Sequence, residues 1–273
     1  MTDESRQPAQ LNVHVSEQIR FGEKVRRHLT PVNGLVAILD ALGAKNYSDD
    51  EIGRFLDSRD IVLEKLAERA RAGKIDKSRL QVFTFGDTIV VVYRAIQDVS
   101  YKDLGEFGLR MRAFMMHSLT NQILFRGAIS LGRLYVDDDT NTVMGAAVSD
   151  AADWYDKADW IGLQATPHAS LYIEAKLRRA GKRLENVFVD HNVPLKRGGH
   201  VRVKAVNWPK AFYVKGLRPT GNHSSRAMLL SLLARHRSPA GTESKFFNSI
   251  AFFDSVVELQ QLGKRREASS GSS

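Results

Sequence analysis

The amino-acid sequence predicts an α/β protein with one mixed β-sheet. Short apolar runs rich in Val and Ile alternate with segments of helical spacing. Two of these runs, 80–85 and 88–94, are separated by two residues only, which is typical of an antiparallel hairpin. Other runs are separated by a helical segment, which allows parallel neighbours. Together these observations predict a sheet with strands of both kinds, packed against helices.

The first half of the chain predicts the core of this fold. The acidic stretch Ser48-Asp49-Asp50-Glu51 suits the start of a helix, and Gly86-Asp87 suits a hairpin turn. The expected elements are a helix over 16–29, a strand over 35–42, a helix over 48–71, hairpin strands 80–85 and 88–94, a helix over 103–122 and a strand over 123–136. From the first strand onward, this order resembles the ferredoxin-like βαββαβ arrangement.

The second half predicts additional strands and helices. A Gly follows the basic end of the segment 167–180, as expected where a helix stops. The expected elements are a helix over 145–158, an extended segment over 160–166, a helix over 167–182, strands over 186–195, 200–208 and 210–216, and helices over 224–236 and 242–262.

Length and composition predict a single large domain. The chain has 273 residues, 43% of them hydrophobic, which is enough for a large core. Polar or Ser/Gly-rich ends predict a flexible N-terminus over 1–12, a single domain over 13–263 and a flexible tail over 264–273. No apolar run approaches the roughly 20 residues of a membrane span, so we expect a cytoplasmic protein without a membrane partner.

Charge and cysteine content limit the classes of ligand and metal site that we expect. The formal net charge is +9, which favours anionic ligands, but the basic pairs are scattered and not interleaved with aromatic residues. This pattern argues against a nucleic-acid partner. Because the chain has no cysteine, any metal must be held by oxygen or imidazole ligands. The sequence also lacks an H-x-x-x-H pair, a P-loop and a G-x-S-x-G elbow.

Two aspartates are candidate metal ligands. Asp40 closes an apolar run that predicts a buried strand, and Asp87 lies at the hairpin tip. If the two meet at one edge of the sheet, a divalent cation such as Mg²⁺ or Mn²⁺ would relieve their repulsion. Gly43, just after Asp40, would let backbone N–H groups face a phosphate. The alternative is that Asp40 caps a helix and Asp87 is only a turn residue.

Four segments in order resemble the class III nucleotide cyclases: ILDALGAKNYS, QVFTFGDTIVVVY, FRGAISLGRLYV and VMGAAVSDAADW, within about residues 33–165. The resemblance implies a homodimer in which Asp40, Ala41 and Asp87 bind two Mn²⁺ or Mg²⁺ ions. The triphosphate would be cradled by Ala41, Leu42, Gly43, Ala44 and Lys45. The 3′-hydroxyl would then attack the α-phosphorus and expel diphosphate.

The sequence departs from the purine cyclases at positions that contact the nucleotide. Phe83 and Thr142 stand where those enzymes read the base with Lys and Asp, while Ser149 and Asp153 replace their helix Asn and Arg. A bulky ring in the base pocket disfavours a purine. These departures resemble the pyrimidine cyclases of the Pycsar antiphage systems, which implies conversion of UTP to cyclic UMP and a downstream cyclic-nucleotide effector. The alternatives are a cytidylate cyclase that uses CTP, and a nucleotide-binding module without catalysis.

Other side chains are candidates with simpler alternatives. Arg126 is a candidate phosphate clamp, or an arginine paired with a carboxylate such as one of Asp137–Asp139. Tyr47 is a candidate for stacking on the base, or for packing on the next helix. Lys45 and Lys204 are the candidate basic residues for the triphosphate, although most lysines are solvated.

Overall fold

The structure is a computed structural model that describes residues 31–72, 79–137, 140–219, 224–236 and 241–270. Its first half has the predicted βαββαβ order. The elements are β1 (Val32–Ala41), α1 (Asp49–Ala72), β2 (Leu80–Phe85), β3 (Thr88–Arg94), α2 (Tyr101–Thr120) and β4 (Phe125–Asp137). The four strands lie in the order β2-β3-β1-β4 and are antiparallel throughout. The ferredoxin-like core is therefore confirmed.

The second half extends the sheet to eight strands. Its elements are β5 (Thr142–Met144), α3 (Ala146–Trp154), β6 (Gly162–Ala165), α4 (Pro167–Ala180), β7 (Phe188–Pro194), β8 (His200–Val206), α5 (Ser225–Leu233) and α6 (Glu243–Ser270). Strand β6 pairs parallel with β4, and β8 pairs antiparallel with both β6 and β7. The prediction of a mixed sheet with added C-terminal strands and helices is confirmed.

Three local predictions differ from the structure. The expected strand over 210–216 is instead a 3₁₀ helix over Pro209–Tyr213, where Pro209 stands in the first turn, the position at which its fixed φ favours a helical start. The short strand β5 was not anticipated. Helix α6 runs to Ser270, into the segment expected to be a flexible tail, and this stretch contains the helix formers Lys, Arg, Glu and Ala. The expected helix over 16–29 and the segment 1–12 lie outside the described residues.

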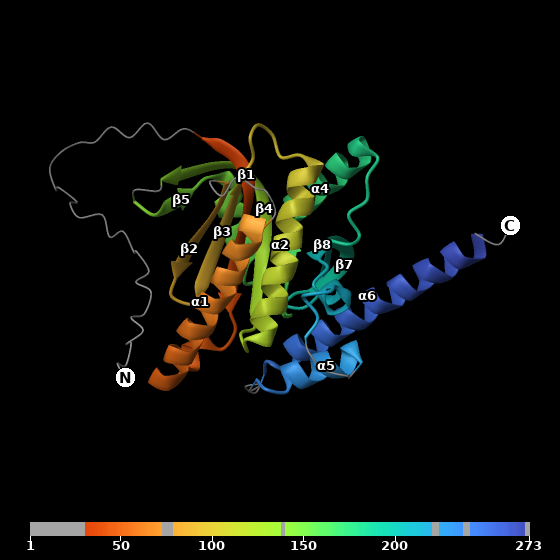
Figure 1. The fold of residues 1–273 in the computed structure, drawn as a ribbon. Coiled ribbons are helices and arrows are strands. Elements are labelled where there is room, and N and C mark those ends of the chain that lie inside the picture. The colour runs from red at the N-terminus through yellow and green to blue at the C-terminus, as the bar shows by residue number, and fades with distance from the viewer. Residues whose placement is uncertain (1–30, 73–78, 138–139, 220–223, 237–240, 271–273) are drawn as a thin grey trace, which may run out of the picture.

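Helices cover the two faces of the sheet unequally. Helices α1 and α2 lie across one face (Figure 1), where Leu35, Ala37 and Leu39 of β1 join the main hydrophobic core. On the opposite face Val36 and Ile38 belong to a smaller cluster with residues of α3. Because side chains alternate along a strand, Asp40 lies on the α3 face. Close approach of β1 and β4 requires Gly127, where a Cβ would lie 2.2 Å from the carbonyl oxygen of Ile38.

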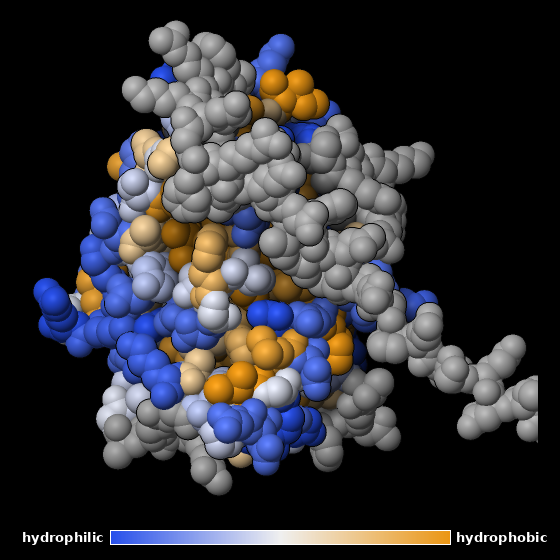
Figure 2. Space-filling view, turned by 90° about the vertical axis from the view of Figure 1, so that its left-hand side faces the viewer, coloured by the Kyte–Doolittle hydropathy of each residue, from blue (hydrophilic) through white to orange (hydrophobic). Residues whose placement is uncertain are grey.

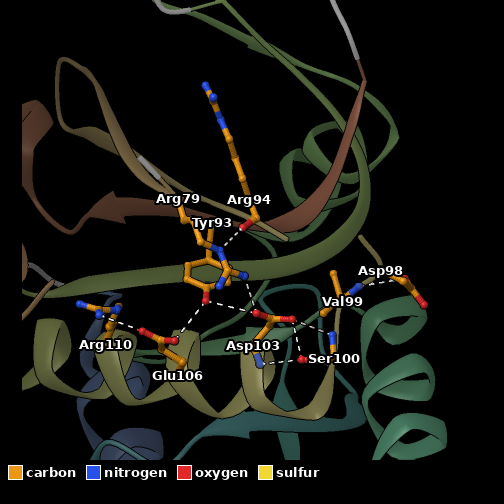
Figure 3. A network of polar contacts seen from close by, with 9 residues as sticks. All are labelled: Arg79, Tyr93, Arg94, Asp98, Val99, Ser100, Asp103, Glu106 and Arg110. Carbon is orange, nitrogen blue, oxygen red and sulfur yellow. Dashed lines mark hydrogen bonds and ion pairs between the residues drawn. The ribbon is translucent and has the colours of Figure 1, made fainter. Parts of the chain in front are cut away.

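A polar network fixes the start of α2 on β3 (Figure 3). The Tyr93 hydroxyl donates toward Glu106 and Asp103, at 3.1 and 3.3 Å, and the Arg79 guanidinium lies over the Tyr93 ring and pairs with Asp103. Asp103 also completes a capping box with Ser100. Burial and the charge of Glu106 raise the pKa of Tyr93 well above its usual range. These partly buried charges are thus part of the scaffold.

Candidate active site

The structure brings the segments of Asp40 and Asp87 together. Asp40 pairs with Thr88 in the β1–β3 register, and the N–H of Ala41 donates to the carbonyl of Asp87 at 3.1 Å. Gly86, with φ of 60°, makes the two-residue turn that places Asp87 beside the end of β1. Asp40 lies inside a strand, so it does not cap a helix. The two residues therefore lie at the same end of neighbouring strands.

Arg126 is paired with a carboxylate, and that carboxylate is Asp40. The two residues are direct cross-strand partners in β4 and β1. Nε and Nη2 of Arg126 donate to the same oxygen, Oδ2 of Asp40, at 3.0 and 2.7 Å. Both side chains are mostly buried, with 12% and 17% of their surface exposed. Asp137, one of the partners that the sequence suggested, is instead buried at the end of β4 and accepts a hydrogen bond from Thr140.

The segment after β1 offers fewer phosphate-facing N–H groups than expected. The N–H of Ala41 is bound to Asp87, and that of Leu42 donates to Leu124 at 2.8 Å. Gly43 has φ of 90° and leads into a 3₁₀ helix of three residues, Ala44–Asn46. Backbone contacts to a phosphate would therefore come from residues 43–45. Lys45 is exposed beside them.

Tyr47 packs on the next helix, as the simpler alternative predicted. Its ring centroid lies 5.8 Å from that of Phe55 in α1, and its hydroxyl points to the carbonyl of Leu42 at 3.4 Å. Burial raises the pKa of Tyr47, and the charges of Glu51 and Asp87 raise it further. In this conformation the Tyr47 ring holds the loop after β1 against α1.

Two further residues lie within electrostatic reach of Arg126. Tyr155, at the end of α3, packs against the Val36–Ile38 cluster, and burial together with Asp40, Asp156 and Asp87 raises its pKa although Arg126 opposes this. Burial and the charge of Arg126 lower the pKa of Lys196, although Asp156 opposes this. Lys196 lies in the β7–β8 turn. No local sequence signal connects these residues with Asp40, because they come from distant segments.

The β7–β8 turn is held against the loop that follows α3. The N–H of Lys196 donates to the carbonyl of Lys157 at 2.9 Å, and its Nζ lies 3.5 Å from Asp156. The N–H of Asp159 donates in turn to the carbonyl of Pro194. These contacts position the Lys196 side chain near Arg126, at the start of β4.

Helix α3 is fixed on the sheet by Asp150. Oδ2 of Asp150 accepts hydrogen bonds from the buried hydroxyls of Ser130 in β4 and Thr166 after β6, at 2.6 and 2.5 Å. On the same helix Ser149 and Asp153 are exposed, and the Ser149 hydroxyl donates back to the carbonyl of Gly145. The replacements of the cyclase Asn and Arg therefore face outward in the single chain.

The residues at the expected base positions differ in exposure. Phe83 is only 3% exposed and belongs to the apolar cluster on the α3 face. The hydroxyl of Thr142, in β5, donates to the carbonyl of Thr140 at 3.1 Å.

Lys204 does not fit its expected role as a ligand of the triphosphate, because Glu174 and Asp190 bind its ammonium group at 2.8 and 3.0 Å.

The donor set fits a divalent ion that is completed by substrate. Among the described residues no group of three or more His, Asp or Glu side chains is placed to hold a metal. Asp40 and Asp87 supply two hard carboxylates, and Mg²⁺ or Mn²⁺ is commonly bound by one or two carboxylates together with substrate phosphates.

In the described parts of the chain, no helix is long and apolar enough to span a membrane.

Comparisons with known proteins give similar structures only. No family model and no curated protein matches the chain. The adenylyl cyclase CyaB from P. aeruginosa is 15% identical over 71% of this chain and 100% of that one, with a TM-score of 0.45. The guanylyl cyclase domain of the RhoGC fusion protein from Blastocladiella emersonii is 14% identical over 66% and 97%, with a TM-score of 0.42. The guanylate cyclase domain of RhGC from Catenaria anguillulae, in complex with GTP, is 15% identical over 65% and 98%, also at 0.42. These values establish no activity for this chain.

Proposed function

We propose that this protein is a nucleotide cyclase that converts a nucleoside triphosphate to its 3′,5′-cyclic monophosphate and diphosphate. The observation that carries the proposal is the junction of Asp40, Asp87 and Arg126 at one end of the sheet, joined by the Ala41–Asp87 hydrogen bond and the Asp40–Arg126 ion pair. Two acidic residues and an arginine at one end of the sheet suit a metal-bound polyphosphate. The resemblance of four segments to cyclase motifs supports this choice of reaction.

Each residue has a role in this reaction. Asp40, Asp87 and the backbone of Ala41 would hold two Mg²⁺ or Mn²⁺ ions, which when bound would neutralise phosphate charge and favour ionisation of the 3′-hydroxyl. Arg126 and the N–H groups of residues 43–45 would hold the triphosphate. The 3′-oxygen forms a bond to the α-phosphorus, its proton passes to solvent, and the bond from the α-phosphorus to the bridging oxygen breaks to release diphosphate.

The residues at the two expected base-reading positions are the basis for proposing a pyrimidine. Phe83 fills the position of a base-reading Lys with a buried apolar ring, and the Thr142 hydroxyl is already bonded to Thr140. A smaller ring is accommodated more easily beside Phe83 than a purine. We therefore propose UTP as substrate and cyclic UMP as product, with CTP as the alternative. The messenger would activate a cyclic-nucleotide effector in antiphage defence.

The active form is proposed to be a homodimer with an isologous interface. Exposed apolar side chains are available for such an interface. Phe85, next to the hairpin tip, is 52% exposed, and Met144, in β5 at the opposite end of β4 from Arg126, is exposed to the same extent. The side of the molecule that carries β5 and β2 faces the viewer in Figure 2, where small hydrophobic patches lie between hydrophilic residues.

A product assay tests this function. Purified protein with Mn²⁺ is incubated with each of the four ribonucleoside triphosphates, and the products are identified by mass. We expect cyclic UMP, and none from Asp87→Asn. Cyclic product from ATP or GTP alone would overturn the pyrimidine assignment. Nucleotide binding without any product would instead favour the non-catalytic module, for which the exposed Ser149 and Asp153 in place of the family's Asn and Arg are the supporting observation.

A further inference from the structure

Arg126 occupies the carboxylate that the proposed metal site needs. Two of its nitrogens donate to Oδ2 of Asp40, and the pair is largely shielded from water. A pair in this setting is stronger than an exposed one because solvent screens it less. A cation that approaches Asp40 must therefore compete with a guanidinium that is already in place.

A second positive charge lies near Arg126. The charge of Arg126, added to burial, lowers the pKa of Lys196, so the two cations are close enough to repel each other. The negative charges that balance this cluster are Asp40 and Asp156. A triphosphate would supply further negative charge and would offer Arg126 pairs of oxygens that match its planar fork.

We propose that Arg126 gates the metal site: in the nucleotide-free protein it holds Asp40 and weakens binding of a divalent ion, and a triphosphate releases Asp40 by drawing Arg126 to itself. This inference rests on the proposed function, because it takes the ion and the triphosphate as the ligands. Competition for one guanidinium couples the two ligands, and the coupling is reciprocal. Metal and triphosphate then favour each other's binding, while each binds weakly alone.

The first test measures Mn²⁺ binding to the nucleotide-free protein by electron paramagnetic resonance. Arg126→Gln is expected to bind Mn²⁺ about tenfold more tightly than the original protein. Lys196→Gln removes a nearby positive charge without touching Asp40, and is expected to change the affinity less than threefold. The double variant Asp40→Asn/Arg126→Gln is expected to lose the tighter Mn²⁺ binding of Arg126→Gln. Arg126→Lys keeps the charge but not the two-nitrogen contact, and is expected to gain about threefold, which provides a second test if the glutamine variant does not fold.

The reciprocal test uses inorganic triphosphate in the presence of EDTA. Asp40→Asn frees Arg126 and is expected to bind this metal-free anion several-fold more tightly, and by a larger factor than Asp87→Asn, which removes a negative charge of the same region without touching Arg126. Equal effects of the two variants would show general electrostatics and overturn the gate.

The outcomes separate the gate from the function. If Mn²⁺ binds the original protein and the Arg126 variants equally, and Asp40→Asn abolishes binding, the gate is wrong and the metal site stands. If no variant with Asp40 intact binds Mn²⁺, both the gate and the metal part of the proposed function are wrong.

Discussion

Asp40 of β1 and Arg126 of β4 stand opposite each other in the sheet and share two hydrogen bonds through one carboxylate oxygen, at 3.0 and 2.7 Å. Asp87, by contrast, is half-buried in the hairpin turn, and its backbone carbonyl accepts the hydrogen bond from Ala41. The two aspartates therefore have different structural roles beside their shared role in the proposed chemistry.

This difference predicts unequal effects on stability. Asp40→Asn leaves a mostly buried guanidinium without its ionic partner and is expected to lower the free energy of unfolding by about 1–2 kcal/mol. Asp87→Asn, in a turn, is expected to change it by less than about 0.5 kcal/mol. Urea unfolding checks both values, and both variants are expected to lose cyclase activity. Equal stabilities would show that the Asp40–Arg126 pair contributes nothing.

Lys196 is expected to contribute to triphosphate binding. Lys196→Ala removes a cation beside Arg126, so KM for the nucleotide is expected to rise about tenfold while the free energy of unfolding changes little. Arg197, exposed at the next position of the same turn, provides the control, and Arg197→Ala is expected to leave KM within about twofold. Steady-state kinetics with UTP measure both, and a similar rise in the two variants would show only a general effect of charge.

Phe83 is expected to support the fold as well as the base pocket. Phe83→Ala removes a buried ring from the apolar cluster and is expected to cost about 3 kcal/mol of unfolding free energy. Phe85→Ala on the same face of β2, where the ring is 52% exposed, is expected to cost less than about 1 kcal/mol. Chemical denaturation distinguishes them, and a neutral Phe83→Ala would mean that the ring is not packed in the cluster.

Asp150 is expected to hold α3 in place. Asp150→Ala leaves the buried hydroxyls of Ser130 and Thr166 without their acceptor, at a cost of about 2 kcal/mol. Asp153→Ala on the exposed side of the same helix is the matched control and is expected to be nearly neutral. Thermal unfolding compares the two, and equal melting temperatures would contradict the anchoring role.

Because His191 is half-buried, the free energy of unfolding is expected to depend on pH. Its ring stacks on Trp160 with centroids 5.2 Å apart and contacts Phe252, and burial lowers its pKa to about 4. His191 takes up a proton near pH 6.5 in the unfolded chain but only near pH 4 in the folded protein. The contribution of neutral His191 to the free energy of unfolding is therefore fully present above pH 6.5 and is lost as the pH falls to 4. The expected loss is roughly 1–3 kcal/mol after allowance for solvent screening.

The His191→Phe variant keeps a ring that cannot take up a proton, so its stability is expected to fall less over this pH range. His168→Gln, at an exposed position in α4, is the control and is expected to keep the original profile. Unfolding in urea at several pH values gives the slopes. Parallel profiles for the original protein and His191→Phe would rule out His191 as a source of the dependence.

The sequence by itself determined the order of the helices and strands, and it identified Asp40 and Asp87 as candidate site residues. Apolar alternation, the Gly86-Asp87 break and helical spacing are local signals, because they follow from backbone geometry and the burial of one face. They were sufficient for the βαββαβ core and for placing Asp40 and Asp87 at neighbouring strand ends. They failed over 210–216, where two adjacent buried side chains pack in a helical turn.

Only the tertiary structure decided how the charges of the site are paired. Asp40 meets Arg126 because β1 and β4 are neighbours in register, although 86 residues separate them in the chain. Lys196 and Tyr155 approach the same region from the β7–β8 turn and the end of α3, whereas Lys204 is paired with Glu174 and Asp190. Electrostatic energy depends on distance in space, and the sheet register and helix packing set those distances.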